Sequence, residues 1–206
     1  MDSRIVGDGR RRIALGGVWL IGLAVSGAIA TDLATWAMEV APVPIAFLLI
    51  AGTQAGRGLS RLALVLIGVH GLVLMLGGAY SYAQVPIGFR VQELFGLDRN
   101  PYDRFGHFMQ GFVPAVALRE LLPKAVIKRG RMLTLTVFAY CLAFSALYEL
   151  IEFGAAVALG QGADAFLGTQ GDPWDTQWDM LFCLIGAVSA WILLSRLQDR
   201  LLHQRT

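Results

Sequence analysis

The chain has 206 residues, of which 56% are hydrophobic and 16% charged, with a net charge of +2 at pH 7 and a mean hydropathy of +0.59. Soluble domains are about 45–50% apolar and about 25% charged, so this composition excludes a soluble globular domain. The long apolar blocks do not alternate, which excludes a transmembrane β-barrel. We expect an all-α, polytopic membrane helix bundle that forms a single membrane-embedded domain over residues 1–206.

Six apolar windows approach the length of about 20 residues that a membrane-spanning helix needs. The second window is short and contains Gln54. The long segment 81–100 is amphipathic and predicts a short interfacial helix between the third and fourth spans. The six predicted spans lie near 13–31, 41–56, 62–80, 103–122, 132–153 and 174–195.

The charges are segregated between alternate loops. With a cytoplasmic N-terminus, 14 of the 17 Lys and Arg residues lie inside, and 11 of the 15 acidic residues lie outside or at outer helix ends. The positive-inside rule therefore places both termini in the cytoplasm. Arg10–Arg12, the apolar run that follows and Ala28–Ala30 also resemble a signal peptide, but we expect the first helix to be kept as an anchor.

Two of the predicted spans open with the same pattern, at residues 100–107 and 172–179. Each has a capping residue, a proline, an aromatic residue, an aspartate and, four residues later, a second ionisable group. Asn100 and Asp172 suit N-cap positions, and a proline suits the first helical position. Asp103 and Asp175 then meet the free backbone N–H groups of the first turn. Capping alone would explain Asn100, Asp172 and Asp175.

His107 and Asp179 lie about 10 Å further along their helices, where capping cannot explain them. Each shares a helix face with the aspartate four residues before it, and Gln110 continues the face of His107. An ionisable group inside a span is by default a candidate functional group.

The fifth span carries two carboxylates on one face at its outer end, Glu149 and Glu152. They are expected to be protonated, to pair across helices or to bind a cation. Arg104 and His107 are the basic candidates expected at their level. A structural ion pair that holds the last three spans together is the alternative interpretation.

These groups define the candidate site at the outer face. A shell of carboxylates with one imidazole suits a hard or borderline divalent cation, and acid–base chemistry by His107 fits equally well. We expect Trp174 and its aromatic neighbours to surround the site. The candidate catalytic residues are Asp103, His107, Glu149, Glu152, Asp175 and Asp179; the candidate metal ligands are His107, Glu149, Glu152 and Asp179; the candidate substrate-binding residues are Arg104, Gln110, Tyr102, Trp174 and Trp178.

The other isolated polar residues have simpler interpretations. Asp32 and Glu39 fall in the first outer loop and are expected to be solvated, whereas His70 is expected to pack inside the third span. Cys141 and Cys183 lie in different spans at different estimated depths, so no disulfide is expected.

Three segments carry a family resemblance: residues 103–107 (DRFGH), 148–152 (YELIE) and 164–180 (DAFLGTQGDPWDTQWDM). Over roughly residues 80–190 the chain resembles the YjdF-type inner membrane proteins of bacteria. This resemblance implies a multi-pass protein of the bacterial inner membrane and implies no particular reaction.

A looser pattern resembles the VanZ-like membrane proteins, which are linked to glycopeptide-antibiotic tolerance. Asp103 with His107, Glu149 or Glu152, Asp179 and Gly186 fill the matching places. The chain departs from that pattern at Cys183, where an asparagine is expected, and at Arg104, where a lysine is expected.

These observations leave three hypotheses. The favoured one is a membrane-embedded enzyme that acts at the outer leaflet on a lipid-linked or amphipathic substrate. The others are a small cation- or proton-coupled transporter and a structural or accessory membrane subunit. Membrane lipids are the expected partners, and the basic residues are explained by topology and anionic lipid headgroups without a nucleic acid.

Overall fold

A computed structural model describes residues 3–122, 127, 130–159 and 169–203. All of the regular secondary structure in these ranges is helical. The elements are α1 (Ser3–Ile29), α2 (Leu33–Val40), α3 (Pro42–Gly52), α4 (Gln54–Arg57), α5 (Arg61–Ala79), α6 (Pro86–Phe95), α7 (Tyr102–Leu121), α8 (Arg131–Leu159) and α10 (Asp175–His203).

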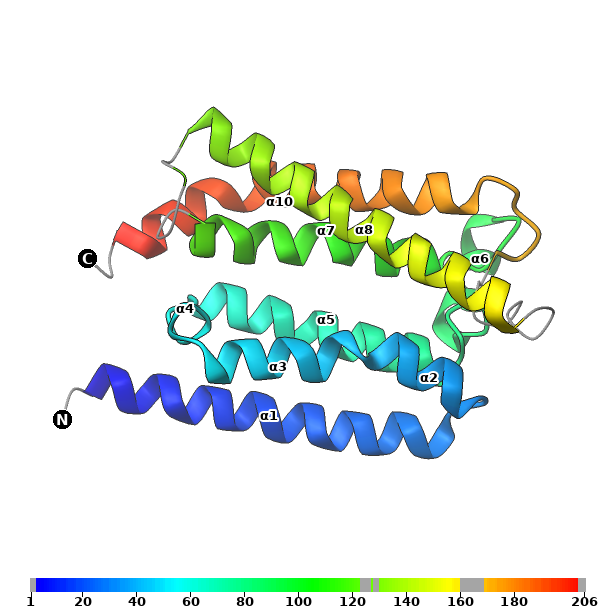
Figure 1. The fold of residues 1–206 in the computed structure, drawn as a ribbon, viewed down its shortest axis with the longest axis horizontal. Coiled ribbons are helices and arrows are strands. Elements are labelled where there is room, and N and C mark those ends of the chain that lie inside the picture. The colour runs from blue at the N-terminus through cyan, green and yellow to red at the C-terminus, as the bar shows by residue number, and fades with distance from the viewer. Residues whose placement is uncertain (1–2, 123–126, 128–129, 160–168, 204–206) are drawn as a thin grey trace.

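The long helices run lengthwise through one bundle, and the chain reverses direction between them (Figure 1). We call the end that carries α4 the α4 end and the opposite end the α6 end. Helix α1 begins and helix α10 ends at the α4 end. This places both extremes of the described chain on the same side of the bundle, as the sequence predicts for the two termini.

Five of the described segments are long and apolar enough to cross a membrane: Arg12–Ile29, Leu33–Gly52, Arg61–Ala79, Arg131–Ala158 and Asp175–His203. The predicted span near 103–122 corresponds to α7, which has 20 residues but a mixed polar and apolar sequence. Because α7 lies inside the bundle and packs most closely against α10, its polar residues meet protein. The total of six spans and the cytoplasmic orientation of the termini stay predictions.

Side chains define where several helices begin. The Asp32 carboxylate accepts a hydrogen bond from Thr35 N (2.7 Å) at the start of α2, and this contact lowers the pKa of Asp32. The Ser60 Oγ accepts from Ala63 N (3.1 Å) at the start of α5. The short helix predicted within residues 81–100 is confirmed as α6, which ends at Gly96 in the left-handed conformation (φ 60°) that glycine tolerates; its place at the membrane interface stays a prediction.

The second span begins earlier than the sequence predicted. We expected a loop up to residue 41, but α2 and α3 together make the span Leu33–Gly52. Proline in the first turn of α3 interrupts the backbone hydrogen bonds there. Ala41 nevertheless keeps helical dihedral angles (φ −50°, ψ −37°), so the result is an interrupted helix.

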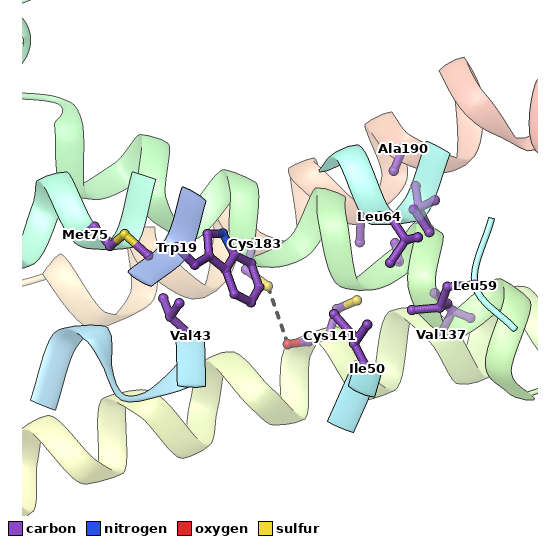
Figure 2. Packing of buried hydrophobic residues seen from close by; sticks show 14 of the residues in the cluster. Trp19, Val43, Ile50, Leu59, Leu64, Met75, Val137, Cys141, Cys183 and Ala190 are labelled. Atoms are coloured by element: carbon purple, nitrogen blue, oxygen red, sulfur yellow. Dashed lines mark hydrogen bonds between the residues drawn. The ribbon is translucent and has the colours of Figure 1, made fainter. Parts of the chain in front are cut away.

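The apolar core joins two halves of the bundle, the first half formed by α1 to α5 and the second by α7, α8 and α10. Trp19 of α1, Val43 of α3 and Met75 of α5 are buried on one side, and Cys141 of α8 and Cys183 of α10 on the other (Figure 2). Both cysteines are free, as predicted. Their depths are not as different as expected, because the Cys183 Sγ lies 3.4 Å from the Cys141 carbonyl oxygen.

Glycines allow α7 and α10 to approach until their backbones touch. A Cβ added at Gly111 would collide with the Cys183 carbonyl oxygen, and one added at Gly186 would collide with the Phe108 carbonyl oxygen. Membrane helices commonly pack this closely at small residues. His107 lies one turn from Gly111, so this contact also sets the distance between the polar groups at the α6 end.

Candidate functional site

His107 is the centre of a buried polar cluster at the α6 end. Its Nε2 atom lies 3.8 Å from the Asp103 Oδ1, 3.8 Å from the Glu149 Oε1 and 4.0 Å from the Asp179 Oδ2. These four residues come from α7, α8 and α10, and each is 8% exposed or less. We call Asp103, His107, Glu149 and Asp179 the imidazole cluster.

The imidazole cluster contains polar atoms with no partner in hydrogen-bonding geometry within the described part of the chain. They are the His107 Nδ1, the Glu149 Oε1 and the Asp179 Oδ1, all shielded from solvent. The separations of 3.8–4.0 Å around Nε2 are also too long for direct hydrogen bonds. A buried polar atom without a partner is costly, so this arrangement is poorly explained as a structural strut.

Three of the four residues lie close enough together to hold a cation after their side chains move inward. One ligand atom from each of Asp103, His107 and Asp179 can be chosen so that all lie within 4.8 Å of one another. A metal with bonds of about 2.0–2.2 Å separates tetrahedral ligands by about 3.3–3.6 Å. Ligand atoms up to 4.8 Å apart would therefore have to approach one another by as much as about 1 Å around such an ion.

The two glutamates of α8 occupy different environments. Glu149 is buried and belongs to the imidazole cluster. Glu152 lies nearly one turn further along α8 and is partly exposed. Neither glutamate belongs to the three-residue group that could hold a metal, although both were predicted as ligands. The carboxylate that the structure adds to the predicted ligand set is Asp103.

Arg99 is a basic residue at this level that the sequence reasoning missed. Its guanidinium pairs with Asp175, lies 3.7 Å from Asp103 and 3.7 Å from Asp172, and is about one-tenth exposed. We had expected Arg104 and His107 to be the basic groups there. The spacing of four residues between Arg99 and Asp103 was a signal that could have revealed it.

The remaining predicted residues lie around the cluster. The Arg104 guanidinium donates to Asp172 (2.7 Å) and lies over the Trp178 ring, 5.3 Å from its centroid. Trp174 is largely exposed, and Gln110 is half-buried beyond His107. Tyr102 is buried instead, and its hydroxyl donates a hydrogen bond to the Val73 carbonyl oxygen (3.0 Å).

The repeated openings have the same local structure. The Asn100 Oδ1 accepts from Tyr102 N (3.0 Å), and the Asp172 Oδ1 accepts from Trp174 N (2.9 Å). Both side chains thus cap the turn before their helices. The prediction that they are the helix N-caps was wrong, because the helices begin two and three residues later and the N-cap of α7 is Pro101. Gln170 joins the openings by exchanging two hydrogen bonds with the Asn100 backbone (3.0 and 3.1 Å).

Glu39 is buried, and the prediction that it is solvated was wrong. It is 4% exposed at the end of α2 and accepts a hydrogen bond from the Tyr148 hydroxyl (2.5 Å). The Tyr148 ring in turn meets the His107 ring edge-on, with centroids 6.3 Å apart. The second span was predicted near 41–56, which left Glu39 in the loop before it. Asp32 is exposed as predicted.

Comparison with known proteins supports the predicted family. A family described as predicted membrane protein (DUF2238) matches residues 12–200. The chain belongs to this DUF2238 family. It is 51% identical over 183 residues to the inner membrane protein YjdF of Escherichia coli (strain K12), which covers 88% of each chain. No solved structure matches significantly.

Membership in the DUF2238 family confirms the YjdF resemblance and the inner-membrane location, and the protein is a multi-pass membrane protein embedded in lipid. The looser VanZ-like pattern is not among these matches. The family description names no reaction, so the imidazole cluster is the main indication of any activity.

Proposed function

We propose that this protein is a membrane-embedded enzyme that acts at the outer leaflet on a lipid-linked or amphipathic substrate, with a divalent cation held by Asp103, His107 and Asp179. The observation that carries the proposal is the geometry around the His107 Nε2. Carboxylates from three helices surround it at 3.8–4.0 Å without direct hydrogen bonds.

The donor set indicates which cation would fit. Carboxylate oxygens with one imidazole nitrogen suit Mn²⁺, Zn²⁺ or a similar divalent ion, and the absence of thiolate ligands from this set argues against a structural zinc site. Such an ion would polarise a phosphoryl or carbonyl oxygen. Glu149, with an unpartnered buried oxygen beside the same imidazole, is placed to accept or return a proton.

The surroundings of the cluster suit a substrate with an anionic head and an apolar body. Arg99 and Arg104 lie beside the acidic residues at the α6 end, and arginine forks bind phosphate oxygens in pairs. Trp174 and Trp178 are 63% and 42% exposed, so their rings can meet an acyl or prenyl chain at the membrane interface.

Metal content is the first test. We expect purified wild-type protein, loaded with Mn²⁺ or Zn²⁺ and desalted, to retain about one ion per chain. Asp103→Asn and His107→Ala should retain none while still folding. Glu93→Gln is the matched control, because Glu93 is an exposed carboxylate on α6 outside the cluster. Wild-type protein that is folded but holds no ion would refute the metal part of the proposal.

Turnover is the second test. A polyprenyl diphosphate presented in detergent micelles is a suitable probe, with released inorganic phosphate as the readout. Release by the wild type and the Glu93 control, but not by the two cluster variants, is the expected result. Metal binding without release from this probe would favour a different amphipathic substrate class or the transport function below.

A second candidate function is cation or proton transport. The observation that favours it is the interruption between α2 and α3, beside the buried Glu39, because broken helices form ion sites in many transporters. Ion-dependent pH changes inside sealed proteoliposomes, abolished by Glu39→Gln, would favour transport over catalysis.

A further inference from the structure

We propose that a cavity at the α4 end, between α7, α8 and α10, binds the headgroup of an anionic phospholipid. The cavity has a volume of about 480 Å³. It lies at the opposite end of the bundle from the imidazole cluster, so this proposal stands independently of the proposed function. The polar and aromatic residues that line it are Arg119, Arg131, Thr134, Trp191, Ser195 and Asp199.

The cavity follows from the way the helices cross. Helix α8 runs obliquely across α7 and α10, and its first turn stands away from them at the α4 end (Figure 1). Towards the membrane centre the same three helices close around Cys141 and Cys183, which are fully buried. A second void of about 10 Å³, with Val116 and Val137 in its walls, continues inward from this end. The space is therefore a wedge that narrows with depth.

The charges of the lining favour a single anionic group. The lining contains two arginines, Arg119 and Arg131, and one acidic residue, Asp199. Arg119 is held by Gln198 (3.1 Å) and Asp199 (3.2 Å), which orients its fork at the edge of the wedge. Arg131 is exposed and forms no ion pair with any other described residue. A phosphodiester could accept hydrogen bonds from both guanidinium groups, as in other interhelical basic pockets.

The rest of the lining distinguishes a lipid from a soluble anion. Trp191 and Leu135 line the cavity and are 42% and 62% exposed, so the wedge is open towards the side of the bundle that faces lipid. Thr134 and Ser195 add hydroxyl groups next to the arginines. An indole and hydroxyls at headgroup level, with an apolar exit for acyl chains, match a phospholipid that enters from the membrane.

Native mass spectrometry of the detergent-solubilised full chain can test this assignment. We expect wild-type protein to retain phosphatidylglycerol in preference to phosphatidylcholine. Arg131→Gln should weaken that retention by about tenfold, since it removes one charge-assisted contact. Arg119→Gln should act in the same direction. Arg196→Gln is the matched control, because Arg196 is an exposed arginine of α10 that does not line the cavity.

Three results would overturn the proposal. Arg131→Gln could retain phosphatidylglycerol as well as the wild type, phosphatidylcholine could bind equally well, or inorganic phosphate could displace the lipid at matched concentration. The last result would assign the cavity to a soluble anion. Arg119→Gln also removes contacts to Gln198 and Asp199, so its thermal unfolding is measured alongside, while Arg131→Gln tests the site without touching those contacts.

Discussion

The two ends of the bundle each contain a buried polar cluster, and the two clusters are built in opposite ways. At the α4 end, Glu120 accepts hydrogen bonds from the Ser60 N (2.6 Å), the Ser60 Oγ (2.6 Å) and the Gln198 Nε2 (2.9 Å). At the α6 end, the carboxylates surround His107 without direct hydrogen bonds and leave buried atoms unpartnered. Satisfied buried polar networks stabilise a fold, whereas unsatisfied ones are typical of sites that bind something.

The largest expected effect is on stability at the α4 end. Glu120→Ala removes the acceptor for three buried donors, which are the N and Oγ of Ser60 at the cap of α5 and the Nε2 of Gln198 on α10. We expect the free energy of unfolding in detergent to fall by about 3 kcal/mol, because each stranded donor loses its partner without regaining water. Glu93→Ala on α6 is the control and should change stability little.

Metal binding by the Glu120→Ala variant tests whether the two clusters are independent of each other. At a temperature where this variant is folded, it should still retain the ion, since Glu120 is at the far end of the bundle from His107. Loss of the ion from a folded Glu120→Ala protein would mean that the two ends are coupled and that the contrast between them is wrong.

The next effect concerns the helix contact that positions the imidazole cluster. Gly186→Ala would place a methyl group against the Phe108 carbonyl oxygen and force α7 and α10 apart. We expect a loss of about 2 kcal/mol, in the range for overpacked cores, together with weaker metal retention. Thermal unfolding and metal content measure the two effects on the same samples.

Gly154→Ala is the matched control for that substitution. Gly154 also lies within a long helix, but a Cβ there meets nothing within 4 Å. Because alanine is the better helix former, this variant should gain about 0.5–1 kcal/mol. A similar loss in both variants would trace the effect to helix propensity and not to the contact between α7 and α10.

A smaller effect is expected where the two halves of the bundle meet. Tyr148→Phe removes the donor to the buried Glu39 but keeps the ring that packs against His107. We expect a loss of about 1–2 kcal/mol from the stranded carboxylate. Tyr140→Phe, at an exposed tyrosine of the same helix, should change the unfolding free energy by much less, and equal losses would argue against the Glu39 contact.

The sequence predicted the parts of this structure that depend on local spacing. The helical class and the short helix α6 follow from composition and periodicity, and turn chemistry predicts that Asn100 and Asp172 accept backbone hydrogen bonds just before their helices. The pairing of Asp103 with His107 also follows, because residues four apart share a helix face. Lateral convergence could not be derived in this way, since no helix periodicity tells which neighbour Glu149 or Asp179 will face.

Three residues whose environment was not predicted show what spacing along the sequence cannot reveal. Glu39 was assigned to a loop because the second span was predicted near 41–56, although α2 continues into α3 with only an interruption. Arg99 was overlooked because it lies in the turn before α7. Glu120 was counted with the inner charges, yet it is 4% exposed and its partners Ser60 and Gln198 are 60 and 78 residues away in the sequence.

The smallest expected change in stability is the most informative about the imidazole cluster. Asp179→Asn keeps the side-chain shape and removes one of three carboxylates that face a single imidazole. Because like charges this close disfavour the folded state, the metal-free variant should be as stable as the wild type or more stable by about 1 kcal/mol. It should nevertheless lose the bound ion. If the free energy of unfolding instead fell by about 3 kcal/mol, as expected for Glu120→Ala, Asp179 would be a structural residue. Both clusters would then serve mainly to stabilise the fold.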